Sequence, residues 1–140
     1  MIGFLLDTDH VSLQERGHLP LLTRLRVQPP EALSVSIVTV QESVRGRLAL
    51  LSRQLPSDQL LLAYAKLQQT VQFFSTVPVL AFDRRCLEQY DALRSQGVRI
   101  GTLDLRIAAT ALVHKLTMVT RNTKDFARVP GLQIEDWAEN

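Results

Sequence analysis

A chain of 140 residues with a formal net charge of +2 can bury the core of one compact domain and is too short for two domains of ordinary size. Its single cysteine, Cys86, excludes an intrachain disulfide and favours a reducing compartment. Arginines far outnumber the three lysines, and arginine serves phosphate binding and surface ion pairs alike. No targeting or membrane-spanning run is visible, so we predict a soluble, cytoplasmic protein.

Short apolar runs alternate with stretches of helical spacing, which predicts an α/β domain with a mostly parallel sheet. The first half contains a strand over Ile2 to Leu6, followed by a short helix from about Asp9 to Glu15 that Gly17 ends. A second strand runs from Leu33 to Val38, and a helix follows from about Val40 to Arg53. A long helix, capped by Ser57 or Asp58, then reaches about Phe74. The long helix has an apolar stripe that fits core packing, dimerisation or docking of a partner, made of Leu60, Tyr64, Leu67, Val71 and Phe74.

The second half continues the same alternation. It contains a strand from Val79 to Phe82, a helix capped by Asp83 that ends before Gly97, a helix from Thr102 to about Lys115, a strand from Thr117 to Thr120, a helical turn from Thr123 to Arg128, and an edge strand at Gln133 to Ile134. This order predicts that helices cover the faces of the sheet.

Four acidic residues fall at the ends of these elements. Asp7 ends the first strand, Glu42 lies in the first turn of the helix after the second strand, Asp104 opens a later helix, and Asp125 follows the last buried strand. Because the carboxyl ends of parallel strands share one edge, where such folds bind ligands, we expect the four to converge. Converging carboxylates repel one another unless a cation neutralises them, and oxygen ligands suit Mg²⁺ or Mn²⁺. The pattern therefore indicates hydrolysis of a phosphate ester or nucleic acid.

Each acid also has a structural interpretation. Asp7 and Asp9 are both candidates for the cap of the first helix. Glu42 completes a capping box that begins at Thr39, an interpretation compatible with a catalytic role if the helix start faces the site.

The later acids have alternatives of the same kind. Asp104 lies on the helix side opposite a polar stripe of Arg106, Thr110 and His114, so it faces the interior or a cleft, although the helix dipole alone could stabilise it.

Asp125 stands three residues after Asn122, a spacing that also permits capping, and Asp83 is interpreted as a helix cap and kept as a reserve site residue. The three histidines share no metal-ligand spacing and are assigned no role, and Cys86 is expected to be buried and inert.

Four segments in order resemble a PIN domain, specifically a VapC-like toxin ribonuclease. They are Leu5-Leu6-Asp7-Thr8-Asp9-His10-Val11-Ser12, Val38-Thr39-Val40-Gln41-Glu42, Ile100-Gly101-Thr102-Leu103-Asp104-Leu105-Arg106-Ile107-Ala108-Ala109, and Val119-Thr120-Arg121-Asn122-Thr123-Lys124-Asp125-Phe126, which continues into Val129-Pro130-Gly131-Leu132 and ends near Trp137. The resemblance spans nearly the whole chain and implies one PIN domain over residues 1–140 with a Rossmann-like parallel sheet.

The resemblance also implies a metal-dependent endoribonuclease acting on single-stranded or looped RNA. Asp7 and Asp104 would bind Mg²⁺ or Mn²⁺, Glu42 would orient the waters of the metal, and Asp125 with Asn122 would complete the pocket. Arg121 and Arg106 are the candidates for contacting phosphate. The same resemblance implies a homodimer and a cognate antitoxin. One departure is Asp9, which stands where many relatives carry asparagine.

Two other functions remain as alternatives. Asp7-Thr8-Asp9 after an apolar strand resembles the nucleophile loop of a haloacid-dehalogenase-type phosphatase, in which Asp7 would attack phosphorus and Asp9 would act as the acid. The chain is short for that family and lacks a well-placed lysine to complete the site. The other alternative is a PIN module that binds RNA or a partner without cutting.

Overall fold

The computed structural model describes residues 3–139 and contains a parallel sheet in the strand order β3-β2-β1-β4-β5. Its strands are β1 (Phe4–Leu6), β2 (Leu33–Ser36), β3 (Val79–Leu80), β4 (Thr117–Val119) and β5 (Ile134–Glu135). The chain runs outward from β1 to β2 and β3 and then returns to place β4 on the other side of β1. Strand order therefore reverses between β1 and β4, which is where open α/β sheets bind ligands.

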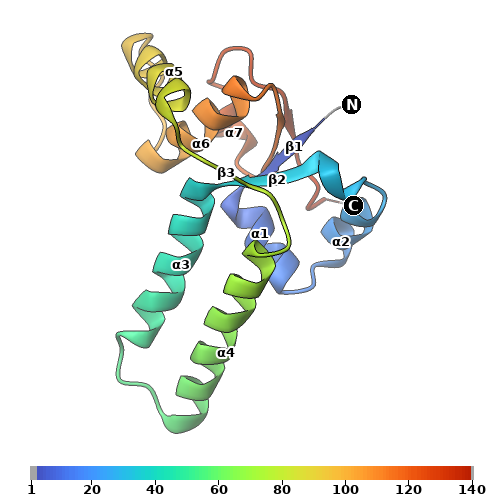
Figure 1. Cartoon of the computed structure of the whole chain (residues 1–140), viewed down its shortest axis with the longest axis vertical. Coiled ribbons are helices and arrows are strands. Elements are labelled where there is room, and N and C mark those ends of the chain that lie inside the picture. The colour runs from blue at the N-terminus through green and yellow to red at the C-terminus, as the bar shows by residue number, and fades with distance from the viewer. Residues whose placement is uncertain (1–2, 140) are drawn as a thin grey trace.

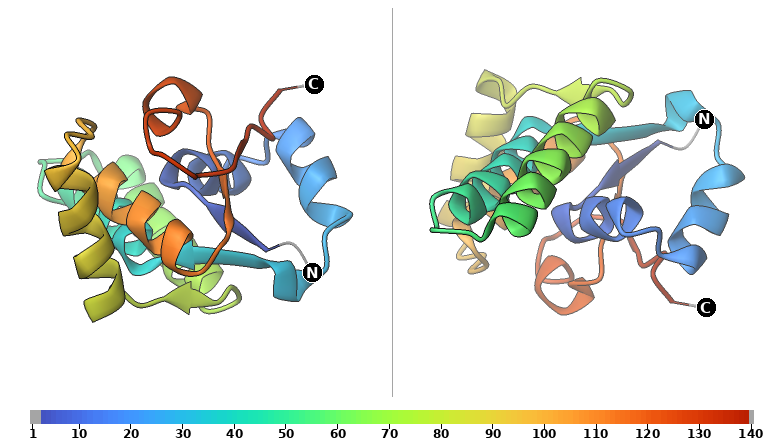
Figure 2. Two further views of the ribbon diagram at one scale, coloured as in Figure 1. Left: turned by 90° about the horizontal axis from the view of Figure 1, so that it is seen from above. Right: turned by 90° about the horizontal axis from the view of Figure 1, so that it is seen from below.

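The strands are joined by helices that lie on both sides of the sheet (Figures 1 and 2). They are α1 (Thr8–Glu15), α2 (Leu19–Arg26), the 3₁₀ turn η1 (Pro30–Ala32), α3 (Ile37–Leu51), α4 (Ser57–Phe74), α5 (Arg84–Ser95), α6 (Thr102–Val113) and α7 (Thr123–Phe126). The predicted α/β class with a parallel sheet flanked by helices is confirmed.

Alternating strand residues build two cores, one on each face of the sheet. Leu5 and Met118 pack with side chains from α5, α6 and α7. Phe4, Leu6 and Val119 pack on the other face against α1, α2 and the C-terminal segment. In that second core the ring centroids of Phe4 and Trp137 lie 4.8 Å apart in an edge-on arrangement. The continuous apolar strand runs noted in the sequence are thus explained by burial on both faces.

Most predicted elements are present, with several corrections. The helix α2 was not predicted, and its N-cap residue His18 makes no side-chain capping bond. The predicted strand from Leu33 to Val38 ends at Ser36, whose hydroxyl caps α3 by accepting from the amide of Val38. The predicted strand residue Ile2 lies outside the described residues.

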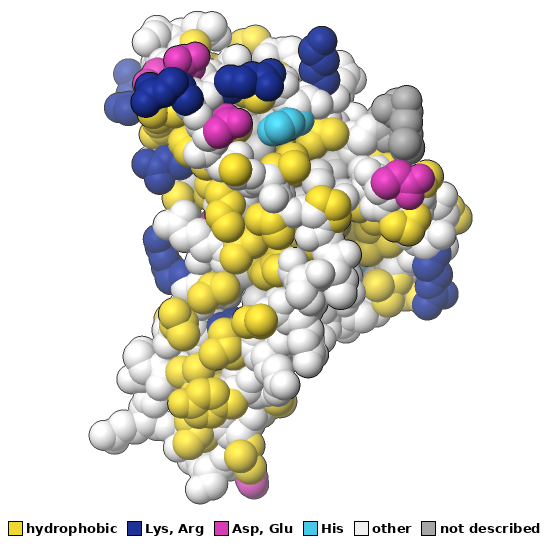
Figure 3. All heavy atoms as spheres, in the orientation of Figure 1, with side chains coloured by type: hydrophobic (Ala, Val, Ile, Leu, Met, Phe, Trp, Pro, Cys, Tyr) yellow, Lys and Arg dark blue, Asp and Glu magenta, His cyan; other side chains and the backbone are white. Residues whose placement is uncertain are grey.

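Three residues of the stripe on α4, Leu60, Tyr64 and Val71, are exposed, so of the interpretations left open by the sequence, core packing does not apply to them. The helices α3 and α4 form a hairpin that extends away from the sheet (Figure 1), and hydrophobic side chains gather over this arm (Figure 3). Its exposed apolar residues are Leu48, Leu60, Leu61, Leu62, Tyr64 and Val71. None of the helices within residues 3–139 is long and apolar enough to span a membrane.

Candidate active site

Asp7 lies at the point where strand order reverses, directly after β1. It is the N-cap of α1, and its Oδ1 accepts a hydrogen bond of 2.8 Å from the amide of Thr8. Its Oδ2 accepts another of 2.8 Å from the hydroxyl of Thr120, which directly follows β4. Only 5% of Asp7 is exposed. Asp7 can therefore be a helix cap and a site residue at the same time.

The burial of Asp7 changes its acidity. Desolvation, followed by the negative charge of Asp9, raises the pKa of Asp7 to about 7, although the hydrogen bonds from Thr120 and Thr8 act in the opposite direction. Asp104 adds a smaller increase. A carboxylate in this position is therefore stabilised by any bound cation.

Glu42 reaches the same region from the second turn of α3. Its Oε1 accepts a hydrogen bond of 2.7 Å from the hydroxyl of Thr8, the residue after Asp7. The predicted capping box is wrong, because α3 begins at Ile37 and Thr39 lies inside it. Thr39 instead lies with its hydroxyl 3.2 Å from that of Thr8. Glu42 is therefore available to the site.

Asp104, in the first turn of α6, is half-buried as its helix position predicts. Desolvation raises its pKa, and the charges of Glu42, Asp125 and Asp9 raise it further, in that order. The charges that act on Asp104 therefore come from acids on α1, α3 and α7. Gly101, the N-cap residue of α6, adjoins this carboxylate, since a Cβ built at Gly101 would lie 3.7 Å from Asp104 Oδ2.

Asp125 is held by its neighbour. Asn122 Nδ2 donates a hydrogen bond of 3.1 Å to Asp125 Oδ2, and the Asn122 amide donates one of 3.0 Å to the Thr120 hydroxyl. Asn122 forms no side-chain capping bond to α7. Thr120 therefore links the loop that carries Asp125 to Asp7.

Both carboxylate oxygens of Asp9 accept hydrogen bonds that the sequence did not reveal. Its Oδ1 accepts a hydrogen bond of 2.7 Å from Nδ1 of the fully buried His10, and its Oδ2 accepts one of 3.1 Å from the amide of Arg121. His10 Nε2 accepts a hydrogen bond of 3.1 Å from the amide of Trp137. Both oxygens of Asp9 are engaged, which leaves it poorly placed to act as the acid of a phosphatase.

The two arginines named for phosphate binding lie in different places. Arg121 is exposed beside Asp9, to which its backbone amide donates. Arg106 lies over the ring of Tyr90, 5.4 Å from the centroid, and lines a cavity of about 270 Å³ with Ile37 and Phe82. Among the described residues Arg106 forms no ion pair with any of the four acids. Its predicted polar stripe is wrong at Thr110, which is fully buried.

Three residues near the acids were not singled out from the sequence: Thr8, Thr120 and His10. The two threonines directly follow Asp7 and β4, so their position at strand ends was a usable signal. The role of His10 depends on Trp137, which is distant in sequence, and no local pattern indicates it.

Within residues 3–139, no group of three or more His, Cys, Asp or Glu side chains is arranged to hold a metal ion by itself. Mg²⁺ is nevertheless commonly bound through one or two carboxylates, with water and substrate phosphates as its other ligands. Asp7 and Asp104 fit that donor chemistry, because both are oxygen ligands whose charge is disfavoured by burial and by neighbouring acids. Each oxygen of Asp7 accepts one hydrogen bond and retains another lone pair.

Comparison with known proteins agrees with the fold. A "tRNA(fMet)-specific endonuclease VapC" of Shigella flexneri is 29% identical over 143 residues, covering 99% of this chain and 100% of the relative. "Ribonuclease VapC2" of Rickettsia felis is 38% identical over 69 residues, which are 46% of this chain and 52% of that protein. A solved toxin–antitoxin complex from Klebsiella pneumoniae contains a chain with a TM-score of 0.75 and 28% identity, covering 99% of this chain and 100% of that one.

The PIN domain family matches residues 5–132, which include all four acids. The phosphatase alternative has no comparable support. From its fold, its site and this match, the chain belongs to the PIN domain family.

Proposed function

We propose that this chain is a divalent-metal-dependent endoribonuclease that cleaves single-stranded or looped RNA and acts as the toxin of a toxin–antitoxin pair. The observation that supports the proposal is the set of hydrogen bonds that joins Thr8 to Glu42, Thr120 to Asp7 and Asn122 to Asp125. Burial and neighbouring acids also raise the pKa of Asp7 and Asp104. The names of the VapC relatives support ribonuclease activity. Unpaired RNA is favoured because its exposed backbone can bend into such a site.

Each acid of the site has a separate role in the proposed reaction. Asp7 and Asp104 would hold Mg²⁺ or Mn²⁺, which when bound supplies positive charge to a phosphoryl oxygen and acidifies water. Glu42 would orient the water that attacks phosphorus, while the P–O bond to the leaving oxygen breaks. Asp125, held by Asn122, would complete the acidic pocket. Thr8 and Thr120 position Glu42 and Asp7 through their hydroxyls.

The test is cleavage of labelled single-stranded RNA and of a tRNA by the purified chain with Mg²⁺ or Mn²⁺. Asp7→Ala prepared in parallel and a chelator are the controls, because a contaminating nuclease would survive the substitution. We expect cleavage to disappear in both controls. Cleavage that persists in Asp7→Ala would refute the site. Binding of RNA without cleavage under any metal would support the non-catalytic alternative, and a phosphoenzyme trapped on Asp7 would support the phosphatase.

The proposal includes a cognate antitoxin and a homodimer. The support is the similarity to a toxin–antitoxin complex together with the exposed apolar arm of α3 and α4. Exposed apolar side chains gathered on one arm often mark a site of protein–protein contact. Sedimentation of the chain with Leu61→Lys and Tyr64→Glu, alone and co-expressed with the cognate antitoxin, tests both contacts. A cytoplasmic location stays a prediction.

A further inference from the structure

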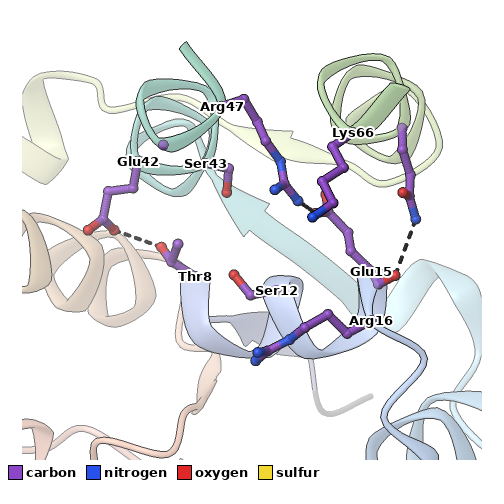
Figure 4. Close-up of a pocket in the computed structure, with 10 residues that line it drawn as sticks. Thr8, Ser12, Glu15, Arg16, Glu42, Ser43, Arg47 and Lys66 are labelled. Atoms are coloured by element: carbon purple, nitrogen blue, oxygen red, sulfur yellow. Dashed lines mark hydrogen bonds and ion pairs between the residues drawn. The ribbon is translucent and has the colours of Figure 1, made fainter. Parts of the chain in front are cut away.

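A cleft of about 440 Å³ opens beside the acidic site, between α1, α3 and α4 (Figure 4). Thr8 and Glu42 belong to both the cleft and the acidic site, so the two are continuous. The rest of its lining has a different chemistry, because it is rich in cations and hydroxyls. These residues are Ser12, Glu15, Arg16, Ser43, Gly46, Arg47, Lys66 and Gln69.

One cation of the cleft is already neutralised. Arg47 pairs with Glu15, whose side chain is only 5% exposed, and Glu15 Oε1 also accepts a hydrogen bond of 2.9 Å from the buried hydroxyl of Thr70. Arg47 Nε donates to the same hydroxyl at 3.0 Å. This network joins α1, α3 and α4 and fixes the walls of the cleft.

The two other cations have no such partner. Neither Arg16 on α1 nor Lys66 on α4 forms an ion pair with any carboxylate among residues 3–139. Lys66 points from α4 into the space between the helices, while Arg16 runs along α1 below Ser12 (Figure 4). The cleft therefore has an acidic end at Glu42 and carries positive charge that is not neutralised further along its walls.

One polar group in the wall of the cleft has no hydrogen-bond partner within the described residues. The hydroxyl of Ser43 is buried in the cleft wall and makes no hydrogen bond within the described part of the chain. Beside it, Gly46 leaves space, since a Cβ built there meets no atom within 4 Å. An unused hydroxyl, open space and two unpaired cations together fit an anionic ligand with several acceptor oxygens.

We propose that this cleft is a phosphate subsite that holds the RNA strand next to its cleaved bond, with Lys66 and Arg16 binding the phosphate and Ser43 donating to it. The inference rests on the proposed ribonuclease function and identifies how that site takes its substrate. A nucleic-acid strand carries an anionic phosphate at every nucleotide, so a strand bound at the acidic end extends further phosphates along the cleft. Positive charge next to the acids offsets their repulsion of that strand.

Binding is measured with the full chain carrying Asp7→Asn, which prevents cleavage, and a short fluorescein-labelled single-stranded RNA. We expect Lys66→Ala and Arg16→Ala each to raise Kd about tenfold, and each to lower the magnitude of the salt slope of log K by about 0.7. Lys66→Arg should bind like the parent. Arg53→Ala is the matched control, because it removes one exposed charge at the end of the α3–α4 hairpin, away from the cleft.

A second variant tests the cavity without changing any charge. Gly46→Leu fills the open space and should weaken RNA binding, whereas Ser43→Ala should weaken it without lowering thermal stability. With Asp7 restored, Lys66→Ala should raise KM for cleavage about tenfold and change kcat less than about twofold. A higher KM with a nearly unchanged kcat is expected when the lost group binds the strand away from the reacting phosphorus.

The outcomes separate this inference from the proposed function. If the native chain cleaves RNA and the Lys66, Arg16 and Gly46 variants bind and cleave like it, the subsite is refuted and the ribonuclease stands. If the native chain cleaves nothing but RNA binding still depends on Lys66, the subsite stands and the catalytic proposal fails. An equal loss in Arg53→Ala would mean unspecific attraction and would also overturn the subsite.

The competing occupant is an acidic protein segment, for which a fluorescein-labelled hexaglutamate peptide is the probe. With Mg²⁺ or Mn²⁺ present we expect it to bind more weakly than the RNA, because it has no phosphodiester for a metal at the acidic end to bind. Peptide binding that is lost in Lys66→Ala while RNA binding is unchanged would assign the cleft to such a segment instead.

Discussion

The hydroxyl of Thr120 donates a hydrogen bond of 2.8 Å to Oδ2 of Asp7 and so joins the ends of β4 and β1, which are 113 residues apart in sequence. Both residues are buried, so the bond favours the ionised form of Asp7 where desolvation opposes it. The same hydroxyl accepts from the amide of Asn122 and orients the loop that carries Asp125. Thr120 therefore supports two acids of the site.

Thr120→Val should lower both stability and metal affinity. The variant leaves a buried carboxylate oxygen without its donor, which costs about 1–3 kcal/mol of unfolding free energy. Loss of such a supporting bond typically lowers metal affinity about 10–100-fold. Urea unfolding and calorimetric Mn²⁺ titration measure the two effects. Thr120→Ser keeps the hydroxyl and should restore both, so an equally damaged Ser variant would contradict the assignment.

Asp7→Asn should abolish cleavage and yet stabilise the metal-free protein at alkaline pH. Folding raises the pKa of Asp7 from 3.8 to about 7, so ionisation favours the unfolded state as pH increases between those values. Above this window the charge costs the metal-free fold about 2–4 kcal/mol. In chelator, the unfolding free energy of Asp7→Asn relative to the parent should therefore rise from about pH 4 to about pH 7 and stay constant above it. Parallel pH profiles would mean that Asp7 titrates normally.

Divalent metal should stabilise the native chain more strongly at high pH than at low pH. The metal binds the ionised carboxylate, and at low pH it must displace the proton that the raised pKa of Asp7 and Asp104 retains. Thermal unfolding with and without Mg²⁺ or Mn²⁺ should show a larger rise in Tm at about pH 8 than at about pH 5.5. Asp7→Asn should reduce the rise at both values, whereas an unchanged rise would place the metal elsewhere.

Asp9→Asn should destabilise the protein. The oxygens of Asp9 accept from His10 Nδ1 and from the amide of Arg121, and His10 Nε2 is already occupied by the amide of Trp137. Asparagine has one acceptor and would direct an NH₂ group at a second donor, at a cost of about 1–3 kcal/mol. Urea unfolding checks this cost, and a neutral result would show that the pair with His10 is dispensable.

Gly46→Ala should raise the unfolding free energy by about 0.5–1 kcal/mol, because alanine is favoured over glycine inside a helix and its methyl group meets open space. A fall in stability would mean that the wall of the cleft is tighter than the structure indicates. Chemical denaturation measures the unfolding free energy. Gly46→Leu is then compared with Gly46→Ala, so that the effect of the larger side chain is separated from the effect of losing glycine.

The sequence by itself determined the α/β class, the parallel sheet and the segments that carry Asp7, Glu42, Asp104 and Asp125. Each follows from local rules: apolar runs for strands buried on both faces, helical spacing between them, and acids at strand ends that must meet at one edge. The cap at Asp83 was also predictable, because it depends on residues within one turn, and the structure confirms it.

Tertiary structure alone decided what these segments contact. Thr8 holds Glu42, and His10 meets Trp137, through packing between segments 34 and 127 residues apart. The apolar stripe on α4 was ambiguous, because spacing identifies a helix face but not what packs on it. The cleft with Lys66 and Arg16 exists only because α1, α3 and α4 converge, and no periodicity in one helix encodes that convergence.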